Sequence, residues 1–235
     1  MENKWNKIFE DGQVILINKP LEWTSFDVVR KIRGLLKVKK VGHAGTLDPL
    51  ATGLLILCTG KFTKRINEYM SEEKEYIGTF TLGATTPTYD LESKPENFKP
   101  IEIISEKNIH DAAKSFTGEI MQIPPAHSAV KIDGKRVYEL ARQGKEVLLE
   151  PRKIHIKEFS ITKIALPLVY FRVVCSTGTY IRSLANDFGK ELRCGAYLSG
   201  LCRTRVGGFT LNEAETIESF EEKIRTKKED HNING

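Results

Sequence analysis

The chain has 235 residues, of which 40% are hydrophobic and 29% are charged, so it contains enough apolar material to form a substantial core. No apolar run reaches the length of a membrane span, and the N-terminus carries no apolar signal segment, so we expect a protein of the cytoplasm. The net charge of +5 is too small to identify a partner by itself.

The first half of the chain predicts strands alternating with helices. Strands are predicted where apolar residues run continuously or alternate with polar ones: residues 13–17, 54–58 and 76–82. Helices are predicted where apolar residues recur every three or four positions. One has its apolar face within residues 28–36, after an N-cap at Thr24-Ser25, and another covers residues 61–70. The turn-rich residues 85–100 predict an exposed loop.

The second half continues the mixture without strict alternation. Helices are expected at residues 105–116, 136–143, 179–192 and 217–224, and strands at 118–133 (with a break), 154–165 and 168–176. Residues 200–209 are expected to form a strand or a loop. Because neighbouring strands read as hairpin partners, the pattern predicts an α+β fold with a central mixed, mostly antiparallel sheet flanked by helices. We expect one domain over residues 1–225 and a polar, disordered tail over 226–235.

The four cysteines predict neither a disulfide framework nor a metal site. Cys58, Cys175, Cys194 and Cys202 form no CxxC pair, and no histidine lies at a ligand-like spacing from them. We therefore expect free thiols in a reducing compartment and no bound metal.

A basic segment precedes the most informative loop of the chain. Residues 30–40 contain six lysines and arginines and no acidic residue. Such a run is either a solvated helix face or a surface that contacts phosphates.

The loop itself is residues 42–53, GHAGTLDPLATG, with one carboxylate at its centre. Its glycines allow turns, and Pro49 disfavours a helical conformation at Asp48. Since a buried strand follows directly, Asp48 either fixes a turn or is a paired or functional charge.

Two further residues suit work on a nucleobase. Arg182 lies one turn into a predicted helix, where the helix dipole does not favour a cation, so we expect it to face an anion such as Asp48 or a phosphate, unless it is a surface residue. Tyr76 begins a strand and is either a packing residue or a stacking platform for an unpaired base.

Residues 42–53 resemble the signature of the TruB family of tRNA pseudouridine synthases, in its bacterial form. Four other segments resemble family motifs in the same order: Lys19-Pro20 with Thr24-Ser25, Lys74-Glu75-Tyr76, Gly178 to Arg182, and Gly195-Ala196 with Leu201-Cys202-Arg203. The resemblance covers residues 12–220. It implies a pseudouridine synthase fold and isomerisation of uridine to pseudouridine at position 55, in the tRNA T-loop, with no cofactor and no metal.

The resemblance also implies roles for individual residues. Asp48 is the expected nucleophile, Arg182 its expected partner, and Tyr76 the expected stacking residue. The expected substrate-binding residues are His43, Leu201, Tyr180 and Lys19. For His43 the alternative is a structural imidazole that bonds the loop backbone, and Lys19 is expected to support the site.

Two departures from the family pattern stand out. Where the family has a glycine two residues after Lys19-Pro20, this chain has Glu22. The chain also ends soon after the catalytic motifs, so we expect no C-terminal PUA domain. The segments 84–99 and 124–153 are then candidates for contact with the T-arm of tRNA, and we expect a monomer with no protein partner and no membrane contact. The alternatives to an isomerase are a non-catalytic tRNA-binding or folding module and a base glycosylase.

Overall fold

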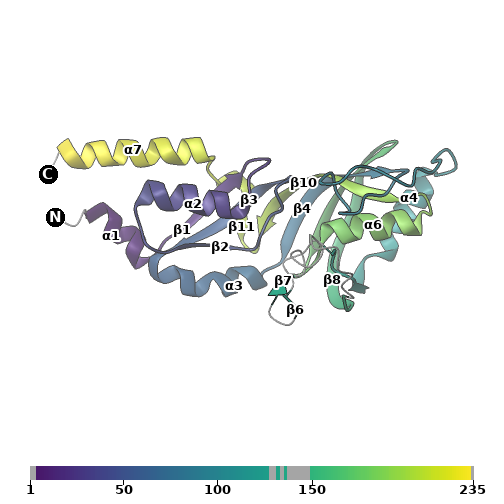
Figure 1. Cartoon of the computed structure of the whole chain (residues 1–235), viewed down its shortest axis with the longest axis horizontal. Coiled ribbons are helices and arrows are strands. Elements are labelled where there is room, and N and C mark those ends of the chain that lie inside the picture. The colour runs from purple at the N-terminus through teal and green to yellow at the C-terminus, as the bar shows by residue number, and fades with distance from the viewer. Residues whose placement is uncertain (1–3, 127–130, 133–134, 137–148, 234–235) are drawn as a thin grey trace. The chain divides into compact units, whose positions relative to one another are not determined.

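The computed structural model of the chain describes residues 4–126, 131–132, 135–136 and 149–233 (Figure 1). The chain divides into two compact units. Unit 1 consists of residues 1–74 and 202–235, and unit 2 of residues 75–201. Within the described residues no helix combines the length and the apolar character needed to cross a bilayer.

Unit 1 is built on strand β3 (Ala51–Thr59), which pairs antiparallel with β1 (Val14–Lys19) and β2 (Val41–Ala44). The end of β10 (Ala196–Val206) lies beside β3 and pairs with β11 (Phe209–Thr210). Residues 54–58 of β3 are completely buried, as a continuous apolar run predicts.

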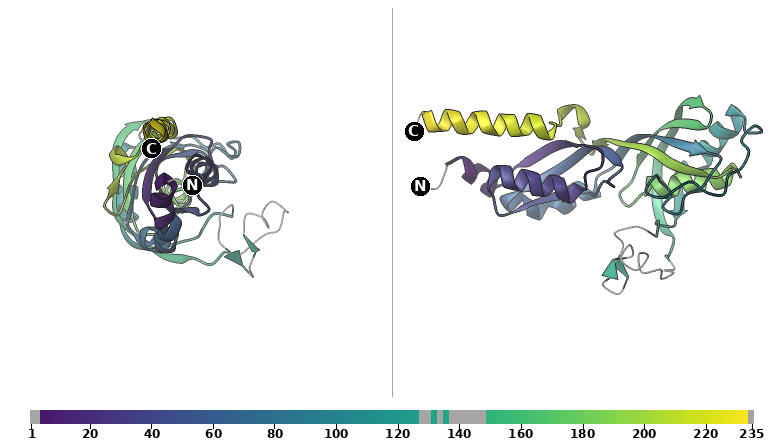
Figure 2. Two further views of the ribbon diagram at one scale, coloured as in Figure 1. Left: turned by 90° about the vertical axis from the view of Figure 1, so that its left-hand side faces the viewer. Right: turned by 45° about the horizontal axis from the view of Figure 1, so that its top comes forward.

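Helices cover the sheet of unit 1. They are α1 (Lys4–Asp11), α2 (Ser25–Leu36), α3 (Ile66–Ser71) and α7 (Ile217–Ile233), with short 3₁₀ turns η1 (Gly60–Arg65) and η2 (Leu211–Glu213). Helix α2 begins with a capping box between Thr24 and Asp27. Its apolar face packs with β1, β3 and the start of α7 in one core cluster, and α7 runs alongside α2 (Figure 2).

Unit 2 holds a sheet in the order β10, β4 (Lys74–Leu82), β9 (Leu168–Cys175), β8 (Arg152–Ala165) and β5 (Gly118–Gln122), in which β8 pairs antiparallel with both β9 and β5. Helices α4 (Glu106–Ser115) and α6 (Ile181–Glu191) also belong to it, and the short strands β6 (Lys131–Ile132) and β7 (Lys135–Arg136) pair separately. Its core contains a phenylalanine cluster in which the Phe80 and Phe171 rings stack with centroids 4.2 Å apart.

The predicted fold class, with a mixed and mostly antiparallel sheet, is confirmed. Three local expectations need correction. The polar segment expected from residue 226 continues α7 to Ile233. The loop at 85–100 is not uniformly exposed, because Thr88 and Asp90 are buried. The helix expected at 61–70 begins as the 3₁₀ turn η1.

Three other expectations stay predictions, because the structure does not test them. The helix expected at 136–143 lies outside the described residues except for Arg136, which ends β7. Much of the segment 124–153 lies outside them as well. The assignment of residues 1–225 to a single domain also stays a prediction. All four cysteines are free thiols, and Cys202 alone is not buried.

Candidate active site

Asp48 lies on an ordered loop of unit 1, as the sequence predicts. The loop leaves β2 after Ala44 and enters β3 at Ala51. The Ala51 amide donates a hydrogen bond to the Asp48 carbonyl over 3.0 Å, which closes a tight turn around Pro49. The turn places the carboxylate shortly before the completely buried residues 54–58 of β3.

The residue before Asp48 is held by the first turn of α2. The Ser25 hydroxyl accepts a hydrogen bond from the Leu47 amide (2.9 Å) and donates one to the Leu47 carbonyl (3.1 Å). Both Ser25 and Leu47 are buried. One side chain therefore satisfies both backbone groups of Leu47, and the start of α2 fixes the approach to the carboxylate.

The residue after Asp48 is held by Lys19, which is completely buried at the end of β1. Its ammonium donates to the carbonyls of Trp23 (2.5 Å), Pro20 (2.9 Å) and Pro49 (3.3 Å). Burial lowers the pKa of Lys19 from 10.5 to about 8, although the Asp48 carboxylate nearby favours the charged form. This geometry agrees with the supporting role expected for Lys19.

Arg203 anchors both arms of the loop and was not singled out in the sequence. Its side chain is 1% exposed, and its Nε donates to the Leu54 carbonyl (2.8 Å) while Nη2 donates to the Gly45 carbonyl (3.1 Å). Its backbone lies so close to Gly53 that a Cβ there would approach the Arg203 carbonyl oxygen to 2.4 Å. The signal for it in the sequence is the family-like segment at residues 201–203, in which the resemblance implies a role for Leu201 alone.

His43 lies on β2, paired with Leu57 of β3. Burial lowers the pKa of His43, and the Arg203 cation lowers it further. A hydrogen bond to the backbone of Gly45 raises the pKa, but by less than burial lowers it. Within the described residues its buried Nδ1 has no hydrogen-bond partner. The ring is therefore held neutral at pH 7. The contact with Gly45 suits the structural alternative, while the unsatisfied Nδ1 suits a ligand contact.

Arg182 belongs to unit 2 and is buried in the first turn of α6. Its Nε lies 3.6 Å from the Asp90 carboxylate, and both side chains are 5% exposed. Its Nη1 also donates to the Thr88 carbonyl over 3.4 Å. The expectation that Arg182 faces an anion is met within unit 2 by Asp90, which the sequence pattern did not single out, and the alternative of a surface arginine is wrong.

Tyr180, Tyr76 and Leu201 also belong to unit 2. The Gln122 side chain bonds both backbone groups of Tyr180, accepting from its amide (2.8 Å) and donating to its carbonyl (3.1 Å), so the start of α6 is fixed to β5. Tyr76 is buried near the start of β4, and Leu201 is half-buried on β10.

The structure thus brings three of the predicted site residues into one loop region of unit 1: Asp48, Lys19 and His43. The other four lie in unit 2, and their meeting with Asp48 in one pocket stays a prediction. Among the described residues no group of three or more His, Cys, Asp or Glu side chains is arranged to hold a metal ion.

Family models match almost all of the chain from residue 33 onwards. Residues 33–181 match the model described as "TruB family pseudouridylate synthase (N terminal domain)". Residues 182–233 match the model described as "tRNA pseudouridylate synthase B C-terminal domain". The two matches are contiguous.

Several curated relatives are similar over nearly their whole length. A tRNA pseudouridine synthase B of Flavobacterium johnsoniae is 54% identical over 92% of this chain and 97% of its own. The tRNA pseudouridine synthase B of Phocaeicola vulgatus is 50% identical over 96% of this chain and 99% of its own.

Solved structures show a similar fold. A chain from a Cbf5–Nop10–Gar1 complex is 31% identical with a TM-score of 0.75, over 96% of this chain and 58% of that one. A chain from an H/ACA RNP bound to a substrate RNA containing 2′-deoxyuridine is 28% identical with a TM-score of 0.73, over 97% of this chain and 58% of that one. Together with the family models and the identity to the curated relatives, these likenesses show that the chain belongs to the TruB family of pseudouridylate synthases.

Proposed function

We propose that the chain isomerises uridine to pseudouridine at position 55 in the T-loop of tRNA, with Asp48 as the nucleophile. The broader activity follows from family membership: the chain is a tRNA pseudouridine synthase, an isomerase. The observation that supports the finer proposal is the way the Asp48 loop is held. Ser25, Lys19 and Arg203 bind backbone groups before and after Asp48, so this carboxylate is presented on a rigid turn.

The chemistry needs a carboxylate that can bond to the substrate and then leave it. An aspartate is ionised at neutral pH and forms covalent intermediates in other enzyme classes. In the proposed reaction the bond from N1 of uracil to C1′ of ribose breaks and a bond from C5 to C1′ forms. C5 loses a proton and N1 gains one, so the composition of the RNA is unchanged.

Arg182 and Tyr76 complete the proposed site. Arg182 would keep Asp48 charged and oriented when RNA displaces water from the site, because a cation nearby favours the ionised carboxylate. Its own position is set within unit 2 by Asp90 and the Thr88 carbonyl. Tyr76 would stack on the flipped uracil, and a tyrosine with an ordinary pKa near 10 would need help to remove the C5 proton.

RNA affinity is assigned to the basic segment at residues 30–40, which begins in the middle of α2 and continues past its end. Residues 30–40 carry six cations without an acidic residue, and they lead directly into β2 and the Asp48 loop. Phosphate contacts of this kind release counterions, so the affinity for tRNA should fall steeply as salt is raised.

The reaction class is tested by its products. Unmodified tRNA incubated with the protein should keep its mass while one uridine, at position 55, becomes pseudouridine after nuclease digestion and chromatography. The matched control is a tRNA transcript with cytidine at position 55, which should remain unmodified. Loss of a base would identify a glycosylase, and tight binding with unchanged nucleosides would identify a non-catalytic binding module; either result contradicts the proposal.

A further inference from the structure

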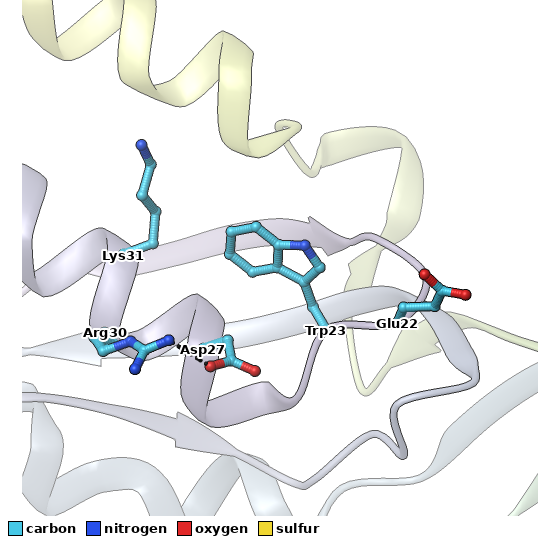
Figure 3. A pocket seen from close by; sticks show the side chains of 5 residues that line it. All are labelled: Glu22, Trp23, Asp27, Arg30 and Lys31. Atoms are coloured by element: carbon cyan, nitrogen blue, oxygen red, sulfur yellow. Dashed lines mark hydrogen bonds and ion pairs between the residues drawn. The ribbon is translucent and has the colours of Figure 1, made fainter. Parts of the chain in front are cut away.

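A pocket of about 320 Å³ lies in unit 1, and one of its lining residues, Glu22, is hydrogen-bonded to the residue after the candidate nucleophile. Five residues from the turn after β1 and from α2 line it: Glu22, Trp23, Asp27, Arg30 and Lys31. Figure 3 shows the Trp23 indole standing between the Glu22 and Lys31 side chains. The pocket combines an aromatic ring with both signs of charge.

Trp23 is a fixed platform. Its side chain packs against the core cluster below α2, and its carbonyl accepts a hydrogen bond from the buried Lys19 ammonium. Unpaired bases of RNA are recognised mainly by stacking on aromatic side chains held in this way.

Glu22 supplies a carboxylate at a position that favours glycine. Its φ of 65° lies in the left-handed region, and its amide donates to the Pro49 carbonyl over 2.9 Å. The turn expected for the family's glycine is therefore kept, and it leads directly to the residue after Asp48. The Glu22 side chain is exposed and lines the pocket, where it can accept hydrogen bonds from a base.

Arg30 supplies the positive charge. One of its guanidinium nitrogens lies 2.9 Å from Asp27, and the side chain is 67% exposed. Asp27 itself is engaged in the cap of α2, and Lys31 pairs with Glu221 of α7 over 2.6 Å. Arg30 is therefore the pocket cation best placed for a phosphate, since its planar fork has further donors.

We propose that this pocket binds an unstacked nucleotide of the RNA substrate that neighbours the isomerised uridine. Its base stacks on Trp23, an amino group of the base donates to Glu22, and its phosphate contacts Arg30. The assignment rests on the proposed function, because only an RNA held at Asp48 brings a neighbouring nucleotide to the Pro49–Glu22 contact. Uracil fits less well, since it has no exocyclic amino group and its single N3–H donor is flanked by two carbonyl oxygens that a carboxylate repels.

Tryptophan fluorescence tests the stacking step. The chain has two tryptophans, so a Trp5→Phe variant leaves Trp23 as the sole indole. Titration of this variant with an unmodified T-arm stem-loop should quench the fluorescence in parallel with binding measured by filter retention. RNA that binds and is isomerised without changing Trp23 emission overturns this inference and leaves the proposed function standing. RNA that neither binds nor reacts overturns both.

Substitution of the carboxylate tests the contact to the base. Glu22→Gln keeps an acceptor oxygen but removes its charge, so it should weaken binding of the stem-loop by up to about tenfold, because a hydrogen bond to a charged acceptor is roughly twice as strong as one to a neutral acceptor. Glu22→Gly should do the same, and glycine accepts the left-handed turn, so misfolding cannot account for the loss.

The matched control is Glu218→Gln, on the exposed surface of α7. Removing the negative charge of Glu218 should leave RNA binding unchanged or strengthen it slightly. If Glu22→Gln binds the stem-loop as tightly as the wild type, or if both glutamine variants weaken binding equally, the proposed contact is wrong. A second RNA, a stem-loop whose loop bases lack amino groups, should lose no affinity on Glu22→Gln. If it loses as much affinity as the unmodified stem-loop, the proposed contact to Glu22 is also wrong.

Discussion

The buried Lys19 ammonium makes a prediction about stability that depends on pH. Lys19 is completely buried, and burial lowers its pKa from 10.5 to about 8 in the folded protein. In the unfolded chain the pKa returns to its ordinary value. Between these two pH values the unfolded chain binds more protons than the folded protein, so the free energy of unfolding rises with pH through this window. A Lys19→Met variant has no ammonium to titrate at this position, so its free energy of unfolding lacks this rise with pH.

The size of the effect follows from the two pKa values. One pKa unit corresponds to about 1.4 kcal/mol, so the change from 10.5 to about 8 corresponds to roughly 3 kcal/mol. Because the unfolded chain is still partly protonated at pH 10, about 2–3 kcal/mol should be observed between pH 7 and pH 10.

Urea unfolding followed by circular dichroism measures this contribution. The stability of the wild type minus that of Lys19→Met should increase by about 2–3 kcal/mol from pH 7 to pH 10. Taking the difference removes groups that titrate alike in both proteins. A difference that stays constant with pH would refute the lowered pKa of Lys19, and a difference that falls would mean that the charged ammonium stabilises the fold more than its burial costs.

Three further predictions concern the same unit. Arg203→Met should lower the free energy of unfolding by about 2–4 kcal/mol in urea titrations, because one buried and one partly buried carbonyl lose a charged donor. Gly53→Ala should lower the melting temperature strongly, since φ is +104° and the new Cβ would meet the Arg203 backbone, whereas Gly34→Ala, with open space inside α2, should raise it. Ellman's reagent at pH 8 should modify Cys202 in the native protein but not Cys58, whose pKa is raised by burial to about 11; rapid labelling of Cys58 would contradict its burial.

Much of the fold was predictable because local patterns and tertiary structure agree. The apolar run at 54–58 is buried in β3, and Ser105 caps α4 as its sequence predicts. Helix α7 extends to Ile233 because charged residues such as Lys227 and Glu229 are good helix formers, and an exposed helix needs no apolar face there. The polarity of that segment indicated exposure rather than disorder.

The candidate site was predictable in part. Asp48 was identified from its position between turn formers and a buried strand, and the structure places it on such a turn. Arg203 was missed because its role depends on two backbone carbonyls that lie far from it in sequence. Asp90 was missed because it lies in a turn-rich loop that reads as exposed, whereas its burial beside Arg182 is a tertiary effect.

The central claim is that Asp48 is the nucleophile of the isomerisation, and one measurement tests it most directly. Unmodified tRNA carrying tritium at C5 of uridine is incubated with the wild type and with Asp48→Asn, which keeps the shape of the side chain and removes its charge. The wild type should release the tritium of one uridine per tRNA, and the variant should release none while still binding tRNA in a filter assay. Tritium release that survives the substitution would contradict the role of Asp48.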